Sequence, residues 1–113
     1  MPIITYGANK TITCNYHSYS DENGNHKLNE TLVLTFIIDK INGAAYVVGR
    51  NGKDRVRVIP SGVRGSMSFI EVTGAGNVIT TAIGSDGESV HSRNIIINGK
   101  ITPTQCYGEC EFK

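Results

Sequence analysis

Residues 32–59 read LVLTFIIDKINGAAYVVGRNGKDRVRVI, and this stretch decides the fold class. Every second residue from Leu32 to Ile38 is large and apolar, which is the period-two pattern of a strand with one buried face. The pairs Asn42-Gly43 and Asn51-Gly52 then interrupt the apolar runs. Because Asn-Gly tolerates the positive φ angles of two-residue hairpin turns, the stretch predicts three consecutive antiparallel strands.

Similar turn signals separate the apolar runs along the rest of the chain. Further turn signals are Asn23-Gly24, Gly74-Ala75-Gly76-Asn77, Asp86-Gly87 and Asn98-Gly99. The runs between the turns predict eight strands, near Lys10–Ser20, Leu28–Asp39, Ala44–Arg50, Lys53–Ile59, Ser66–Thr73, Val78–Ile83, Ser89–Asn98 and Lys100–Tyr107, with Ile3–Tyr6 as a further short candidate. Such spacing indicates an all-β meander that forms a small closed or partly open barrel, with a sandwich as the alternative.

Composition agrees with this fold class and limits the function classes. The chain has 113 residues, which suits a single domain, and it contains 14 Ile, 9 Val and 10 Thr against only 8 Leu and Ala together. Pleated strands favour β-branched residues, whereas helices favour Ala and Leu. No apolar run approaches the roughly 20 residues of a membrane helix. A net charge of +1 leaves only a local patch to attract an anionic partner.

A change of apolar phase, two prolines and a triple isoleucine each predict a local feature of the strands. The apolar phase slips between Phe69 and Ile70, which predicts a β-bulge there. Pro60 and Pro103 cannot donate to a ladder, so we expect them at strand ends or on edges. Ile95-Ile96-Ile97 is apolar on both faces, which indicates a strand covered on both sides or a partner surface.

The turns at Asn42-Gly43 and Asn51-Gly52 predict a specific pairing of strands. They place Arg50 opposite Lys53, Val48 opposite Arg55, and Tyr46 opposite both Arg57 and Asp39. On the other face they place Val47 opposite Val56 and Ala45 opposite Val58, with Ile38 joining them in the core. The first face is therefore expected to be exposed and basic.

We take this basic face as the candidate binding surface. From Arg50 to Gly65 the chain has five positive charges against one negative charge, and the candidate residues are Tyr46, Arg50, Lys53, Arg55, Arg57 and Arg64. Arginines beside a Tyr ring contact phosphates and stacked bases in some proteins and acidic protein surfaces in others. We expect a protein or another anionic macromolecule as partner, with nucleic acid less favoured. A solvated strand face that prevents edge pairing is the alternative.

Three cysteines bear on stability and compartment. The first and last strands of a closed meander are neighbours, so Cys14 is expected to form a disulfide with Cys106 or Cys110; a local Cys106–Cys110 bridge and three reduced thiols are the alternatives. A disulfide would favour a mature exported protein, whereas reduced cysteines would favour a cytoplasmic location. Residues 1–6 lack the pattern of a secretory signal. A zinc site that adds His17 to the cysteines is disfavoured, because an odd offset on a strand points Cys14 and His17 to opposite faces.

Catalytic patterns are absent from the sequence. His91 and Ser92 are adjacent, so a strand points them to opposite faces, and no nucleophile elbow, P-loop or dinucleotide fingerprint occurs. The Asp86-Gly87 turn places His91 opposite Ala82, on one mixed face with Val78, Thr80, Arg93 and Ile95. We therefore expect a non-enzymatic binding module without a cofactor or metal. The alternatives are a lipocalin-like carrier with a pocket lined by Leu32, Leu34, Phe36 and Phe69, and a hydrolase at the barrel mouth.

The end of the chain resembles a broader group of proteins. Ser89-Val90-His91-Ser92-Arg93-Asn94, Gly99 and Thr102-Pro103-Thr104-Gln105-Cys106-Tyr107-Gly108-Glu109-Cys110 are similar to the endings of small uncharacterised all-β proteins of bacteria and phages. The resemblance covers about the last quarter of the chain. It implies a bacterial or phage origin and carries no activity with it.

Overall fold

A computed structural model describes residues 9–113, and within them it contains eight strands and no helix. The strands are β1 Asn9–Asp21, β2 Gly24–Asp39, β3 Ala44–Gly49, β4 Gly52–Pro60, β5 Met67–Val72, β6 Val78–Ile83, β7 Glu88–Ile97 and β8 Lys100–Phe112. All eight predicted strands are thus confirmed, although β2 begins four residues earlier and β8 ends five residues later than predicted. The further candidate Ile3–Tyr6 lies outside the described residues.

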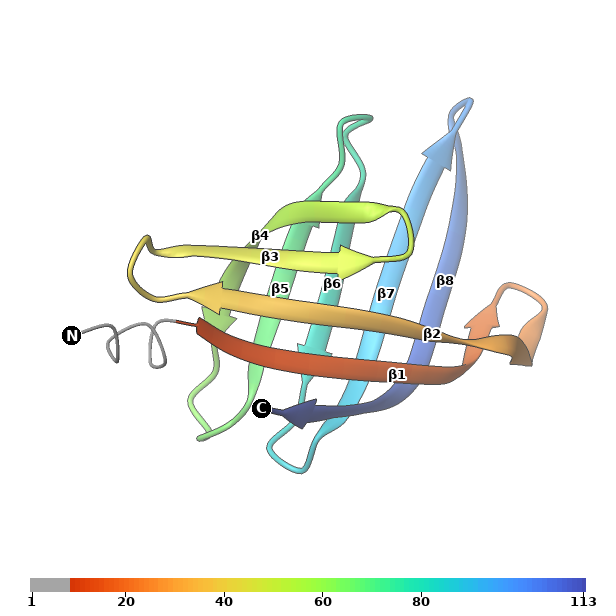
Figure 1. Ribbon diagram of the computed structural model, residues 1–113. Coiled ribbons are helices and arrows are strands. Elements are labelled where there is room, and N and C mark those ends of the chain that lie inside the picture. Colours follow the sequence, from red (N-terminus) through yellow and green to blue (C-terminus); the bar gives the residue numbers. More distant parts are fainter. Residues whose placement is uncertain (1–8) are drawn as a thin grey trace.

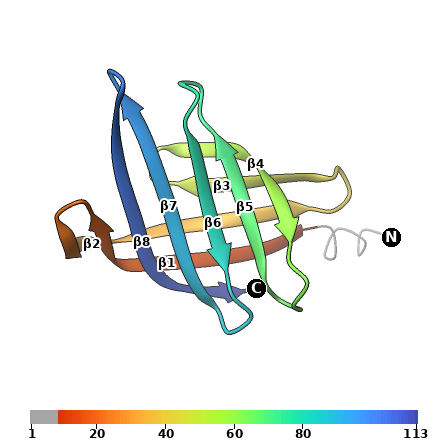
Figure 2. The same ribbon diagram turned by 180° about the vertical axis from the view of Figure 1, so that it is seen from behind.

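The strands form one closed antiparallel barrel, as the spacing of the turns predicts. Each strand pairs with the next along the chain, and β8 returns to pair with β1. β1, β2 and β3 run across the direction of β5 to β8, so the barrel has two crossing walls (Figure 1), which Figure 2 shows from behind. Within residues 9–113 no helix is long and apolar enough to cross a membrane.

The core lies between these two walls. The alternating apolar residues point inward, and Ile12, Cys14, Tyr16, Phe36 and Phe69 are each less than 2% exposed. The rings of Phe36 on β2 and Phe69 on β5 stack with their centroids 4.1 Å apart. Full burial of side chains of this size stabilises a fold by about 1.5–3 kcal/mol each. The core is therefore one packed cluster that holds the two walls together.

A disulfide joins the first and last strands at the seam where the barrel closes. Cys14 on β1 lies directly opposite Cys110 on β8, and their sulfurs are bonded across a sequence separation of 96 residues. Cys106 is a buried free cysteine. The prediction of a long-range bridge from Cys14 is therefore confirmed, and of the two candidates Cys110 is the one that forms it.

The pairing of β2, β3 and β4 differs from the prediction by two residues. Tyr46 lies opposite Arg55 and Ile37, Val47 opposite Asp54, and Val48 opposite Lys53, while Gly49 and Gly52 close the β3–β4 hairpin. A shift of two preserves which face each side chain occupies, so the predicted outward and inward faces remain.

The φ angles of the turns explain this shift. The prediction gave both residues of each Asn-Gly pair a positive φ, but among the described residues Asn98 is the only non-glycine residue with a positive φ. At Asn51-Gly52 the glycine alone takes it, with φ of 134°, so the turn is centred on Arg50 and Asn51. A turn centred one position earlier changes every cross-strand pairing by two residues.

The predicted β-bulge between Phe69 and Ile70 is wrong. β5 pairs with β4 and β6 without a register shift, and Ile70 is a half-buried apolar residue on the outer face. The register shift falls in β1 instead, between Tyr16 and Ser18, where His17 is the extra residue. The apolar Ile70 on the outer face thus gives the sequence the same change of alternation that a β-bulge would produce.

The two prolines lie at a strand end and at an edge, as predicted. Pro60 ends β4, and Pro103 lies in the part of β8 that pairs with β7 before pairing with β1 begins at Gln105, so it occupies an edge. Ile96 and Ile97 are more than half exposed, near the tip of the β7–β8 hairpin. Among residues 9–113 nothing covers the triple isoleucine on both sides.

Candidate functional site

The predicted basic face lies on the outside of β3 and β4. Lys53, Arg55 and Arg57 occupy alternate positions of β4, all exposed, and Tyr46 on β3 pairs with Arg55. The Lys53 ammonium lies 4.5 Å from the centre of the Tyr46 ring, and the Arg55 guanidinium lies 5.8 Å from it. We call Tyr46, Lys53, Arg55 and Arg57 the outer basic face. Cation–π contacts of this kind at an exposed site are worth about 0.5–1 kcal/mol and hold the two cations over one ring.

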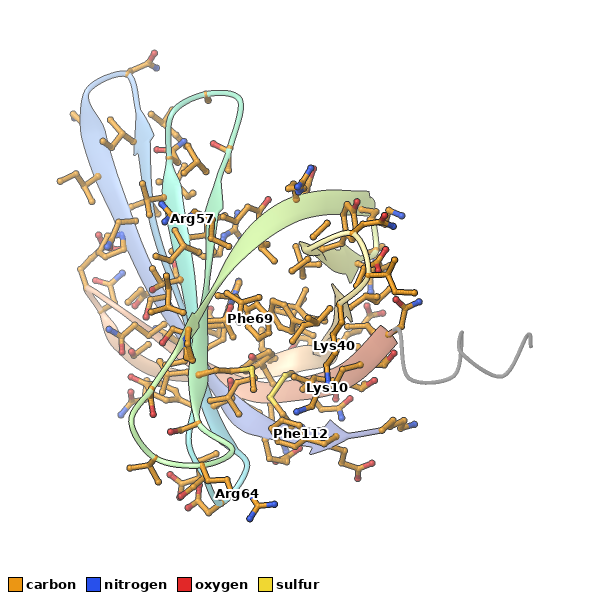
Figure 3. All side chains as sticks on the ribbon, turned by 90° about the vertical axis from the view of Figure 1, so that its left-hand side faces the viewer. Lys10, Lys40, Arg57, Arg64, Phe69 and Phe112 are labelled. Atoms are coloured by element: carbon orange, nitrogen blue, oxygen red, sulfur yellow. A yellow bond between two sulfur atoms is a disulfide. The ribbon has the colours of Figure 1, made fainter. Side chains whose placement is uncertain are left out.

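Two of the six predicted residues lie elsewhere. Arg50 lies at the β3–β4 turn and forms an ion pair with Glu30, with 2.7 Å between Nη2 and Oε2. Arg64 lies in the β4–β5 loop, well away from Arg57 (Figure 3). The pairing by turns thus grouped four residues correctly but also included Arg50, which lies in the turn itself. Proximity in sequence alone added Arg64.

A second site is an open cavity between the two walls, where the β3–β4 turn and the β1–β2 hairpin approach β7 and β8. We call it the mouth cavity; its volume is about 840 Å³. Its lining includes Tyr19, Leu28, Leu32, Arg93, Thr104 and Cys106, with Glu30 and Arg50 among the remaining residues. Cavities that bind small organic molecules have volumes of about 300–1,000 Å³, apolar linings and a few polar groups. The mouth cavity fits that description.

The barrel interior below the mouth cavity is filled. Leu34, Phe36 and Phe69, three of the residues suggested for a carrier pocket, are buried in the core. A cavity bordered by Phe36, Phe69 and His91 has a volume of about 10 Å³, which is close to the minimum for one water molecule. Of the four suggested residues, only Leu32 lines the mouth cavity. The deep pocket expected of a lipocalin-like carrier is therefore occupied by the core itself.

His91 points into the barrel, which corrects the prediction for β6 and β7. The predicted turn placed His91 opposite Ala82, on one mixed face with Val78, Thr80, Arg93 and Ile95, but Thr81 lies opposite His91 and Val90 opposite Ala82. The connection spans the five residues between Ile83 and Ser89, and an odd number exchanges the two faces. His91 is 7% exposed, and its Nδ1 lies 2.7 Å from the Thr81 hydroxyl. Burial, with a smaller effect of Arg93, lowers the pKa of His91 to about 4.

Arg93 lies on the same face of β7 as His91 and lines the mouth cavity. On the inward side it lies between Thr104 of β8 and Ile79 of β6, and Glu71 of β5 lies beyond Ile79 in the same row. Burial raises the pKa of Glu71, the nearby Asp54 raises it further, and Arg93 opposes the rise. Sequence reasoning missed this group of charges, because Asp54, Glu71 and Arg93 come from three strands and only the cross-strand pairing brings them together.

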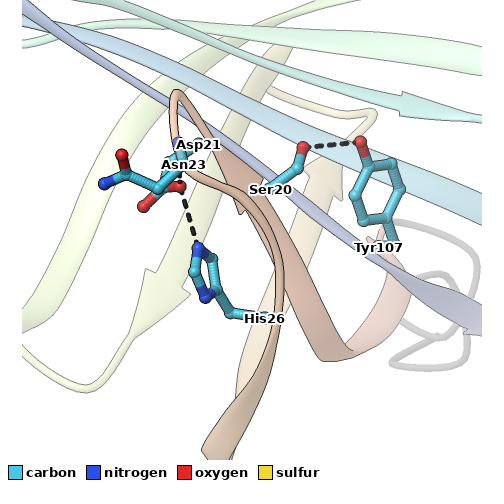
Figure 4. A network of polar contacts seen from close by, with 5 residues as sticks. All are labelled: Ser20, Asp21, Asn23, His26 and Tyr107. Carbon is cyan, nitrogen blue, oxygen red and sulfur yellow. Dashed lines mark hydrogen bonds and ion pairs between the residues drawn. The ribbon is translucent and has the colours of Figure 1, made fainter.

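The wall of the mouth cavity formed by β1 and β2 is held by a polar network (Figure 4). The ring of Tyr19, which lines the cavity, stacks on the ring of His26 with 4.8 Å between centroids. His26 Nε2 lies 2.9 Å from Asp21 Oδ1, and this contact is the main cause that lowers the pKa of Asp21. Ser20 Oγ lies 2.8 Å from the Tyr107 hydroxyl of β8. These contacts hold the β1–β2 hairpin against β8 and set the position of Tyr19.

The cysteines and His17 do not form the zinc site that was considered from the sequence. Cys14 and Cys110 are joined in the disulfide, and His17 Nε2 instead lies 2.8 Å from Glu109 Oε2 at the surface. Burial raises the pKa of the Cys106 thiol, so this residue lines the mouth cavity as a neutral group.

Comparisons of the chain with protein-family models, with curated proteins and with solved structures find no match.

Proposed function

We propose that the protein is a non-enzymatic binding module whose outer basic face contacts an acidic surface of another protein. The observation that carries the proposal is the arrangement of charge on β4. Within residues 9–113, Lys53, Arg55 and Arg57 form no ion pair with a carboxylate, although Arg50 nearby does. Three uncompensated cations in one row, two of them against the Tyr46 ring, form a concentrated positive patch on a protein with a net charge of only +1.

The extent and the residue types of the patch favour an acidic protein over a nucleic acid as its partner. Nucleic-acid binding draws most of its affinity from many phosphate contacts, and proteins that make them carry basic residues over a large surface. Here the positive surface is limited to the outer side of two short strands. Tyr and Arg are also the residue types enriched where protein interfaces bind most tightly.

The disulfide supports export of the protein. The Cys14–Cys110 bond closes the barrel, and disulfides of this structural kind persist in oxidising compartments. We infer a periplasmic or extracellular location, where an exposed basic face meets the acidic surfaces of other exported proteins or cell envelopes. The same reasoning is compatible with the bacterial or phage origin that the end of the chain implies.

A charge-reversal experiment tests the proposed function. The double variant Arg55→Glu/Arg57→Glu should remain folded, because both side chains are exposed on the outer side of the barrel. Binding to a defined acidic peptide, such as fluorescein-labelled polyglutamate, should be measured by anisotropy at increasing salt concentration. We expect the double variant to lose binding, and wild-type binding to weaken steeply with salt.

Arg64→Glu is the matched control, since Arg64 is an exposed arginine outside the outer basic face. It should leave binding almost unchanged. Equal binding by the wild type and the double variant would refute the proposal. Stronger binding to a single-stranded oligonucleotide than to the peptide would assign the face to nucleic acid instead.

A further inference from the structure

The mouth cavity combines one cation with apolar walls. Leu28 and Leu32 of β2 and Tyr19 of β1 provide apolar surface, and Thr104 lies opposite Arg93 on the neighbouring strand. Apolar walls with a few placed polar groups are typical of sites for small organic molecules, because the walls bind the body of the ligand and the polar groups orient it. The chemical composition of the cavity therefore indicates an amphipathic ligand.

Arg93 determines the charge of that ligand. Arg50 also borders the mouth cavity, but Glu30 neutralises it through their ion pair. Arg93, by contrast, is in no ion pair within the described part of the chain. A guanidinium presents paired N–H donors that match the two oxygens of a carboxylate. The cavity thus offers one uncompensated positive charge, and one carboxylate would satisfy it.

We propose that the mouth cavity binds a small amphipathic monocarboxylate, with its carboxylate on Arg93 and its hydrocarbon body against Tyr19, Leu28 and Leu32. Thr104, next to Arg93 on β8, supplies a hydroxyl that can donate to the same carboxylate. The filled core below the cavity keeps the ligand at the mouth. This site is separate from the outer basic face and does not depend on the function proposed for that face.

Contacts within the protein hold the wall that would receive the hydrocarbon body. The stacking of Tyr19 on His26, and the contact of His26 with Asp21, set the Tyr19 ring at the cavity. A preformed wall reduces the entropy that binding would otherwise cost. The bulge at His17 and the four residues of β2 from Leu28 to Thr31 that have no pairing with β1 lie at this wall, and Leu28 lines the cavity together with Tyr19.

Glu71 is the carboxyl group that competes with such a ligand. It lies two strands from Arg93 in the same inward row, and adjacent strands are about 4.8 Å apart, so the two backbones are about 10 Å apart. Glu71 therefore weakens the positive potential at Arg93 without forming an ion pair with it. Removing the charge of Glu71 should strengthen the binding of a carboxylate.

Two-dimensional NMR titration with octanoate and octan-1-ol tests the proposal directly. Octanoate should cause saturable shifts at Tyr19, Arg93 and Thr104, and octan-1-ol should bind about tenfold or more weakly, since it lacks the charge. Arg93→Gln should reduce octanoate affinity to the level of octan-1-ol, whereas Arg93→Lys should retain part of it. Glu71→Gln should raise octanoate affinity and leave octan-1-ol unchanged.

Arg57→Gln is the matched control, because it removes an exposed arginine of the outer basic face. It should bind octanoate as the wild type does, which separates this site from the proposed function. The absence of saturable shifts would overturn the proposal. Shifts centred on β3 and β4, or equal octanoate affinity in Arg93→Gln and the wild type, would overturn it as well.

Discussion

Tyr16 on β1 and Ser89 on β7 share a buried hydrogen bond of 2.8 Å over Gly108 of β8, which lies between them, although 73 positions separate the two residues in sequence. Ser89 Oγ also lies 2.9 Å from the carbonyl oxygen of Ala82, to which it donates. A hydroxyl has one proton to donate, so Tyr16 must be the donor in its bond with Ser89. The phenol therefore has to stay protonated for the core to keep this link between the two walls.

Tyr16 is accordingly predicted to ionise well above the usual pH range of a tyrosine. Burial is the main cause that raises its pKa to about 12, above the value near 10 of an unfolded chain. Because the folded pKa is the higher one, the stabilising effect is complete below pH 10 and is lost as the pH rises toward 12. Spectrophotometric titration should show one late tyrosine, which Tyr16→Phe removes. That variant should cost about 1 kcal/mol near neutral pH. Ionisation of all tyrosines together near pH 10 would contradict this assignment.

His91 should make the protein sensitive to acid. Its folded pKa of about 4 lies below the unfolded value near 6.5, so protonation favours the unfolded chain. Stability should therefore fall as the pH decreases from about 6.5 toward 4, by up to about 3 kcal/mol. Urea unfolding of His91→Gln at several pH values should show this part of the dependence removed. His17→Gln, at an exposed histidine, should retain it; the same loss in both variants would assign the effect elsewhere.

The Cys14–Cys110 disulfide should contribute strongly to stability. A bridge that closes a loop of about 100 residues is expected to stabilise by about 4–5 kcal/mol through the entropy of the unfolded chain. Cys14→Ser/Cys110→Ser should lower the melting temperature clearly, whereas Cys106→Ser should change it far less. Non-reducing peptide mapping should recover the Cys14–Cys110 pair and one free thiol per chain. Three free thiols in protein purified without reductant would contradict it.

Gly108 should be intolerant of any side chain. A Cβ at this position of β8 would lie 1.9 Å from the backbone oxygen of Asn15, next to the bulge of β1. Because backbone atoms cannot move away as a flexible side chain can, Gly108→Ala should destabilise the barrel by several times the roughly 0.5 kcal/mol typical of surface changes. Gly74→Ala, where a Cβ meets nothing within 4 Å, is the control for thermal denaturation. Equal melting temperatures of the two variants would show that β1 and β8 can separate at this point.

Most of the fold could be predicted because its signals are local. Alternation along β2 predicts that Leu34 and Phe36 lie on the buried face. This assignment of faces remains correct despite the two-residue error in pairing, because side chains on a strand return to the same face every two positions. The error arose at the turns, because the prediction gave both Asn51 and Gly52 a positive φ, whereas only Gly52 takes one. In the candidate site, alternation correctly predicted the four residues of the outer basic face. Arg50 and Arg64, which were also predicted to belong to this face, lie outside it.

By itself the sequence determined a meander of eight strands and the inner and outer faces of β2 to β4, and it favoured a bridge from Cys14 while leaving other cysteine states open. Only the tertiary structure decided that Cys110 lies opposite Cys14 while Cys106 lies opposite Tyr19, and that His91 and Arg93 face inward. The same holds for the mouth cavity. The physical reason is that alternation and turn residues act over a few positions. Cross-barrel neighbours depend instead on the register of every strand between them, and one odd connection, between Ile83 and Ser89, exchanges the faces of all that follows.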